Sequence, residues 1–159
     1  MKKIINPFNS GSNPCFACSD RHPFGLHLEF FEDDREVVCY WDPSPHFQGF
    51  PGILHGGIQA TLMDEIASWT VFVKGKTAGV TSDIHVEYRK PVVLGRGKIT
   101  LRSRVDATMD NRMTLHTQLM DGRGNICSEG RVTYYLYPEH IARKRFKYPG
   151  IEAFFEPGP

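Results

Sequence analysis

Residues 54–64 read Leu54-His55-Gly56-Gly57-Ile58-Gln59-Ala60-Thr61-Leu62-Met63-Asp64, and this stretch decides the fold. It joins a glycine turn to an apolar run. No glycine or proline occurs from Ile58 to Val73, which predicts one long helix that begins near the glycines. Apolar residues lie nearly all round this helix, so a sheet wrapped around it would cover only one side. We expect a second copy of the chain to cover the other side.

The start of the predicted helix is the first candidate for chemistry. Its leading backbone N–H groups have no partner within the helix, and the helix dipole adds partial positive charge. This end can therefore hold an anion or polarise a carbonyl group. Gly56 and Gly57 carry no side chain that would keep a ligand away from it.

Asp64 is the second candidate. Small residues stand three and four positions away from it and leave room for a pocket: Ala60, Thr61, Ala67 and Ser68. Its neighbour Glu65 falls within the large apolar arc, so Asp64 is favoured as the reactive carboxylate. Asp64 follows Gly56 by eight residues, about 12 Å along the axis, so one helix cannot easily aim both at one small group. A second copy of the chain would supply the missing partner.

Six runs with the alternation of strands surround the helix, two before it and four after it. They cover residues 26–30, 37–41, 80–88, 99–105, 113–119 and 126–136. In the third run, the alternation places Ser82 on the apolar face with Val80 and Ile84, and Thr81 on the polar face. Strands and helices do not alternate along the chain, which favours an α+β fold over a doubly wound parallel sheet.

Length and charge limit the function classes. The chain has 159 residues, which predicts one domain at 26–137, an irregular lead-in at 1–25 and a C-terminal extension at 138–159 whose aromatic residues indicate packing. The formal net charge of +1 gives no electrostatic case for nucleic acid. No apolar run approaches the roughly 20 residues of a membrane span, and the first residues do not form a signal peptide. We therefore expect a cytoplasmic protein without a membrane partner.

Two of the four cysteines stand close together. Cys15 and Cys18 have the C-x2-C spacing of half a zinc site, but no second pair completes four ligands. The favoured interpretation is a pair of plain thiols in a structured loop. Metal binding or redox use is the alternative, with His22 and His27 as nearby possible ligands.

His55-Gly56-Gly57 followed by Asp64, within the order two strands, helix, four strands, resembles the hotdog-fold acyl-CoA thioesterases. The resemblance is strongest to the group related to the phenylacetic-acid-pathway thioesterase. The lead-in residues 13–18 and 22–26, and Tyr88-Arg89-Lys90-Pro91, match this group as well. The resemblance implies one central helix wrapped by a six-stranded, mainly antiparallel sheet. It also implies a homodimer joined edge to edge, often paired again into a tetramer, with active sites between subunits.

The resemblance further implies how each residue acts on an acyl-CoA thioester. The Gly56 N–H would bind the thioester carbonyl oxygen, where a preorganised donor is worth about 3 kcal/mol in the transition state. Asp64 of the facing subunit would activate water or attack the carbonyl. His55 would support the loop, with direct proton transfer in catalysis as the alternative. Thr81, with Ser82 as its rival, would position water or the carboxylate. Neither a metal nor a cofactor is required, because coenzyme A is part of the substrate.

Further residues are candidates for substrate binding. Many members of the family place Asn or Gln six residues before the histidine, where this chain has Gly49 with Gln48 one residue early. The remaining candidates line the helix start, the small-residue pocket or the basic end of the third run: Gly57, Thr61, Ser68, Arg89 and Lys90. The alternative function is a non-catalytic acyl-CoA-binding or sensing module on the same fold.

Overall fold

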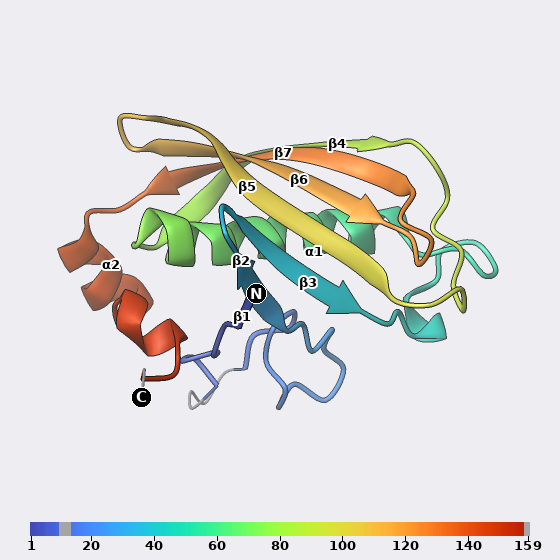
Figure 1. Cartoon of the computed structure of the whole chain (residues 1–159), viewed down its shortest axis with the longest axis horizontal. Coiled ribbons are helices and arrows are strands. Elements are labelled where there is room, and N and C mark those ends of the chain that lie inside the picture. The colour runs from blue at the N-terminus through green and yellow to red at the C-terminus, as the bar shows by residue number, and fades with distance from the viewer. Residues whose placement is uncertain (10–13, 158–159) are drawn as a thin grey trace.

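The computed structural model describes residues 1–9 and 14–157. Within them, one long helix lies under a single antiparallel sheet of seven strands in the order β1-β2-β3-β5-β6-β7-β4 (Figure 1). The strands are β1 (Lys2–Lys3), β2 (Phe30–Asp33), β3 (Glu36–Trp41), β4 (Gly79–Tyr88), β5 (Ile99–Met109), β6 (Arg112–Met120) and β7 (Ile126–Leu136). The helices are α1 (Gly56–Thr70), which continues as a π-helical turn at Val71–Gly75, α2 (Glu139–Phe146), and the 3-10 turns Pro45–Phe47 and Ile151–Phe154. None of the described helices is long and apolar enough to cross a membrane.

The α+β prediction and the central helix are confirmed, but the count of six strands is wrong. The additional strand is β1, in which Lys2 pairs with Glu32 of β2. Asn13, the first residue of the lead-in motif, lies outside the described residues. The helix begins at Gly56, where the glycine turn predicted it.

The first predicted strand starts later than expected, at Phe30. Leu26 and Leu28 are buried, as the alternation predicts, but their N–H groups donate to carbonyl groups of the lead-in. His27 between them has a positive φ of 52°, which interrupts extended backbone. Because the lead-in forms hydrogen bonds with this segment, strand β2 begins only at Phe30.

The core lies between α1 and the sheet. Leu62, Met63 and Ile66 of α1 are fully buried against it. Trp69 is also buried, and its ring stacks on Phe30 of β2 with centroids 4.6 Å apart. By the ordinary value for buried aliphatic and aromatic side chains, each contributes about 1.5–3 kcal/mol to stability. The apolar face of α1 is therefore the main anchor of the fold.

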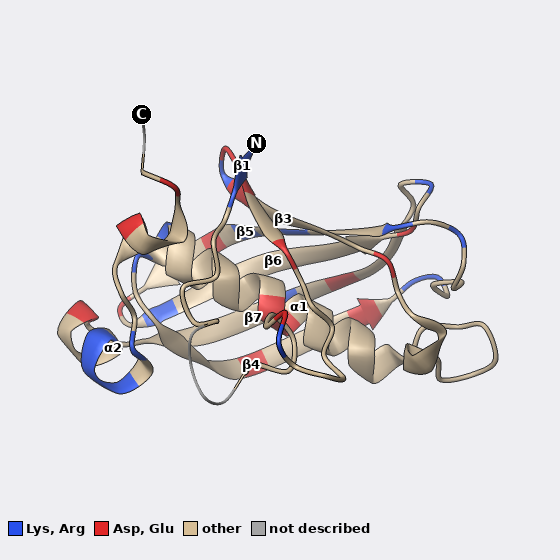
Figure 2. Ribbon diagram, turned by 90° about the horizontal axis from the view of Figure 1, so that it is seen from below, with Lys and Arg blue, Asp and Glu red and all other residues tan. Residues whose placement is uncertain are grey.

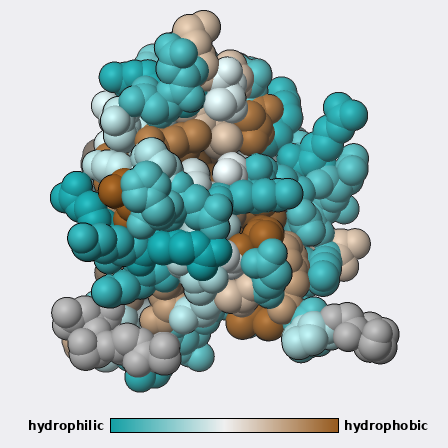
Figure 3. Space-filling view, turned by 90° about the vertical axis from the view of Figure 1, so that its left-hand side faces the viewer, coloured by the Kyte–Doolittle hydropathy of each residue, from teal (hydrophilic) through white to brown (hydrophobic). Residues whose placement is uncertain are grey.

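The C-terminal extension covers the end of α1. Phe154 is fully buried and stacks on Phe72, with ring centroids 5.6 Å apart. The Ile5 N–H donates to the Phe154 carbonyl over 2.8 Å, so both ends of the chain meet here. Seen from this end, the surface is mostly hydrophilic with hydrophobic patches between (Figure 3). The expectation that a second copy must cover the second apolar side of the helix is therefore wrong for this part, because the chain covers it itself.

Strand β4 is an edge of the sheet. It pairs with β7 on one side, and no described strand lies on its other side. Its side chains remain accessible, with Ile84 40% and Tyr88 53% exposed. Beneath this edge, α1 presents a half-buried strip of small or polar residues: Ala60, Thr61, Asp64 and Ser68. An edge with exposed apolar side chains is a surface on which another strand can pair.

Candidate active site

The start of α1 is capped by His55. Its Nδ1 atom accepts a hydrogen bond from the Gly57 N–H over 2.9 Å. A Cβ atom on Gly57 would come within 3.1 Å of that ring, so glycine is needed for the cap. His55 therefore organises the helix start, and the Gly57 N–H that we predicted for substrate is already used.

Gly56 is placed differently. Within the described part of the chain, its N–H donates no hydrogen bond to another backbone group or side chain. A Cβ atom on Gly56 would make only ordinary contact, 3.5 Å from the Tyr88 ring. The fold itself therefore tolerates a side chain at this position, and the open space beside it remains for a ligand.

A cavity of about 570 Å³ opens at this end of the helix. Its walls are mostly apolar, with two basic residues among them: Gly49, Phe50, Ile53, Leu54, His55, Gly56, Gln59, Tyr88, Arg89, Lys90 and Pro91. Gln48 is not among them. Its Oε1 atom accepts from the Gly52 N–H over 3.1 Å, so it braces the loop before the helix. A cavity of this size suits a small organic ligand with an apolar part.

Two residues of this cavity were missed from the sequence. The Tyr88 hydroxyl donates to the Gly56 carbonyl over 2.7 Å and ties the end of β4 to the helix start. The Gln59 side chain is buried, donates to the Leu54 carbonyl and accepts from the Ser128 hydroxyl over 2.9 Å. A glutamine inside an apolar helix was the available signal, because buried polar groups require partners.

Asp64 lies midway along α1, beside Glu65, and these two are the only charged residues of the helix (Figure 2). Its Oδ1 atom accepts hydrogen bonds from the Thr81 hydroxyl over 2.7 Å and the Tyr134 hydroxyl over 2.9 Å. Two donors on adjacent strands thus fix one oxygen and leave the other without a partner among the described side chains. The carboxylate is held in place while one oxygen stays available.

Tyr134 is the other residue that sequence reasoning missed. Burial and the negative charge of Asp64 raise the pKa of Tyr134 well above its usual range, while hydrogen bonding with Thr81 and Ser68 acts in the opposite direction. The hydroxyl therefore stays protonated and keeps donating to Asp64. Its place in the last strand gave no hint of this contact.

A β-bulge decides between Thr81 and Ser82. Thr81 pairs with Tyr134 and the next paired residue is Asp83, so Ser82 is the extra residue. The Ser82 hydroxyl donates to the Thr133 carbonyl over 3.0 Å. The predicted alternation is therefore wrong at this end of the strand, and Thr81 reaches Asp64 although simple period two placed it on the polar face.

The other predicted binding residues differ in whether their side chains already have partners. Thr61 donates to the Gly57 carbonyl over 3.0 Å and so satisfies itself within the helix. Arg89 lines the cavity but forms an ion pair with Glu129. The Lys90 side chain is exposed at the cavity and forms no ion pair with a described residue. Lys90 is thus the more available cation.

The candidate site residues therefore fall into two separate groups in one chain, which we call half-sites. The cavity brings together His55, Gly56, Arg89 and Lys90, whereas Asp64 is not among its lining residues. Asp64 lies with Thr81 and Tyr134, about 12 Å further along the helix by the ordinary rise per residue.

Comparison with known proteins identifies a family profile and relatives that the chain resembles. The profile of the Thioesterase superfamily matches residues 51–128. Rat acyl-coenzyme A thioesterase THEM4 is 34% identical over 71 residues, which are 45% of this chain and 30% of that protein. This chain thus spans about a third of the rat protein.

Solved structures agree on the fold. The PaaI protein of E. coli superimposes with a TM-score of 0.64 at 14% identity, covering 72% of this chain and 82% of PaaI. A hypothetical thioesterase of Streptococcus pneumoniae, solved with coenzyme A, superimposes with a TM-score of 0.65 at 19% identity, covering 70% and 87%. At these identities the likeness establishes the fold alone. Together with the matched profile, it shows that the chain has the hotdog fold of thioesterases.

Proposed function

We propose that this protein hydrolyses acyl-CoA thioesters to a free acid and coenzyme A, as a homodimer with each active site shared between two subunits. One observation carries the proposal: the two half-sites are tied to opposite ends of the same edge strand. Thr81, near the start of β4, holds Asp64, and Tyr88, at its end, holds Gly56.

Antiparallel pairing of β4 with β4 of a second copy would complete the site. Two-fold symmetry places the Thr81 end of one strand beside the Tyr88 end of the other. Asp64 of one subunit then faces the helix start of the second, which its own chain cannot achieve. The exposed edge, with Ile84 40% exposed, is the surface that such pairing would cover.

The chemistry follows from this arrangement. The thioester carbonyl oxygen accepts from the Gly56 N–H, which stabilises the negative charge that builds on it by about 3 kcal/mol. Asp64 of the other subunit takes a proton from water, and the water oxygen attacks the carbonyl carbon. When the tetrahedral intermediate collapses, the C–S bond breaks and the proton passes from Asp64 to the leaving thiolate. Direct attack by Asp64, with an anhydride then hydrolysed by water, is the other route through the same groups.

The substrate class is supported by charge and by the relatives. Lys90 and Arg89 stand where the phosphate groups of coenzyme A would leave an apolar cavity. The rat relative is named for acyl-coenzyme A hydrolysis, and the pneumococcal structure contains coenzyme A. The cavity walls suit an acyl chain or a ring without deciding its length.

The proposal is tested by release of free thiol from short, long and aromatic acyl-CoA substrates. We expect Asp64→Asn and Asp64→Ala to lower turnover by about 10²- to 10⁴-fold, as loss of a general base does. Asp110→Asn is the matched control, because Asp110 lies in the β5–β6 turn with a φ of 52° that asparagine also adopts. Native turnover in both Asp64 variants would make Asp64 structural. Binding of acyl-CoA without turnover by the native chain would instead identify a binding module.

A further inference from the structure

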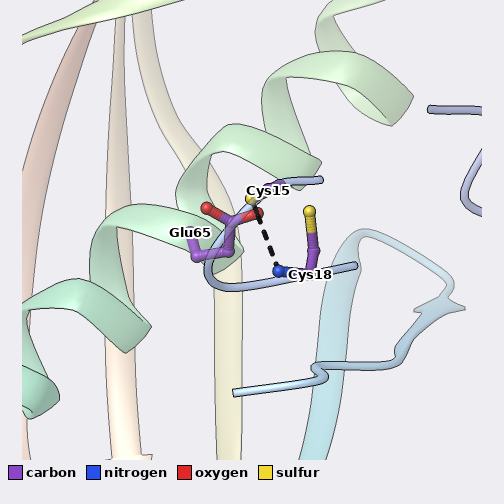
Figure 4. A group of neighbouring side chains, drawn as sticks. All are labelled: Cys15, Cys18 and Glu65. Carbon is purple, nitrogen blue, oxygen red and sulfur yellow. Dashed lines mark hydrogen bonds between the residues drawn. The ribbon is translucent and has the colours of Figure 1, made fainter. Parts of the chain in front are cut away.

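A second cluster lies on another side of α1 from the Thr81 and Tyr134 contacts of Asp64. Cys15 and Cys18 of the lead-in meet Glu65 of the helix, and their potential ligand atoms all lie within 4.8 Å of one another (Figure 4). Cys15 is exposed, whereas Cys18 is buried. The sequence offered only half a set of metal ligands here, and the fold adds a third from 47 residues further along the chain.

The Cys15 sulfur accepts two hydrogen bonds from the backbone. It receives the backbone N–H of Ala17 over 3.3 Å and of Cys18 over 3.4 Å, the latter drawn as a dashed line in Figure 4. The Cys18 thiol and these N–H groups lower the pKa of Cys15 to about 5, against the effect of burial. Two backbone N–H groups thus fix the position of the Cys15 sulfur beside Cys18 and Glu65.

The Glu65 carboxyl group has no basic side chain as an ion-pair partner among the described residues. The Trp69 indole N–H donates to its Oε1 atom over 3.1 Å, and the Cys15 sulfur lies 3.8 Å from the same oxygen. Burial, and next the charge of Cys15, raise the pKa of Glu65 to about 7. No Lys, Arg or His of the described residues forms an ion pair with it. Two sulfur atoms and a carboxylate thus gather without positive charge to balance them.

We propose that Cys15, Cys18 and Glu65 form a binding site for Zn²⁺. Two thiolates and one carboxylate suit this ion, which accepts sulfur and oxygen ligands in tetrahedral geometry. The exposed side of Cys15 leaves the fourth position to water. The Nε2 atom of His27 lies 2.6 Å from the His22 carbonyl, so this imidazole serves the loop and is not gathered with the three ligands.

Binding would release the thiol protons of Cys15 and Cys18 to solvent and place a cation beside the Glu65 carboxylate. It would also fasten the lead-in to the middle of α1. The three proposed Zn²⁺ ligands are distinct from the groups of the proposed hydrolysis, because Glu65 lies on another side of the helix from the Thr81 and Tyr134 contacts of Asp64.

The test is competition for Zn²⁺ between the reduced full chain and a chromophoric chelator. We expect one ion per chain, and an affinity lower by about 100-fold or more in Cys15→Ser and Cys18→Ser, and by about 10-fold in Glu65→Gln. Cys127→Ser, which changes a thiol buried in β7, is the matched control and should bind like the native chain.

Three further measurements show whether the cysteines bind the ion directly and whether the variants are folded. Co²⁺ should give a sulfur-to-metal charge-transfer band that disappears in Cys15→Ser and Cys18→Ser, and circular dichroism should show that both variants are folded. Zn²⁺ should raise the melting temperature of the native chain and not that of the double variant Cys15→Ser/Cys18→Ser. Equal Zn²⁺ affinity in native and double-variant chains would overturn the proposal. So would a reduced chain that binds no Zn²⁺ while its oxidised form contains a Cys15–Cys18 disulfide, since that would assign the pair to redox chemistry.

Discussion

The two ends of β4 contact different groups of α1: a side-chain carboxylate at one end and the backbone of the helix start at the other. Near its start, the Thr81 hydroxyl donates to a side-chain oxygen of Asp64, and Tyr134 of the adjacent strand adds a second donor. At its end, the Tyr88 hydroxyl donates to the backbone of Gly56, beside an apolar cavity with Lys90 at its margin. One end therefore fixes a carboxylate, and the other fixes a helix start.

This difference predicts that substitutions at the two ends of β4 affect kcat and KM differently. In the proposed reaction, changes at the Thr81 end act on Asp64 as the base, which is needed only in the chemical step, so they should lower kcat. Changes at the Tyr88 end act on ligand contacts, so they should raise KM first. A single chain contains both ends but cannot bring them together, which makes pairing of the strands the common requirement.

The largest effect is expected from Ile84→Arg on the exposed edge. A buried, unpaired charge in a strand–strand interface disfavours association, so the dimer should dissociate and turnover should fall by about 10³-fold or more. Light scattering and the thiol-release assay measure both. Met109→Arg is the control, because Met109 is 75% exposed on β5, which is not a neighbour of β4. A fully active monomer would contradict the shared site.

Tyr134→Phe and Thr81→Val should each lower kcat by about 10- to 100-fold with little change in KM, because hydrogen bonds to a charged group are worth about 1.5–3 kcal/mol. Steady-state kinetics at saturating acyl-CoA measures this. Tyr135→Phe is the control, since Tyr135 packs on Tyr137 instead. If both variants keep the native kcat, the hydroxyl groups do not position Asp64.

Lys90→Ala should raise KM for acyl-CoA by about 3- to 10-fold at unchanged kcat, and the increase should shrink at high salt because charge contacts are screened. Arg89→Ala should have the smaller effect, because Arg89 is already paired with Glu129. Kinetics at two ionic strengths tests this order. A larger effect at Arg89 would reverse the assignment of the phosphate contact.

Tyr88→Phe is expected to have the smallest effect, about 5-fold on kcat/KM, because one neutral hydrogen bond contributes about 1 kcal/mol. The Gly56 N–H itself remains in the variant. A drop in kcat as large as that of Tyr134→Phe would show that the two ends of the strand do not have separate roles.

Periodicity was sufficient to predict α1, the later strands and the Asp64 position, because these depend on local patterns. It failed at Thr81 and Ser82, since a bulge adds one residue and reverses the faces without any local marker. Tyr134 and Gln59 were missed because their partners come from distant segments.

Glu65 illustrates the same limit. The sequence placed Glu65 within a large apolar arc, but one member of that arc, Trp69, donates a hydrogen bond from its indole N–H to the Glu65 carboxylate. The contact with Cys15 joins residues 50 positions apart, which no helical pattern can reveal. Local sequence therefore identified the elements that carry the candidate residues, while tertiary packing determined the partners of those residues.

The shared site is tested most directly by mixing two inactive variants. Asp64→Asn keeps the helix start, and Gly56→Val keeps the carboxylate while its side chain enters the cavity, where the fold leaves room for it. Random reassembly makes about half of the dimers mixed, each with one intact and one doubly defective site, so about a quarter of native turnover should return. If the mixed dimers form and remain inactive, Gly56 and Asp64 act within one chain and the account of the site is wrong.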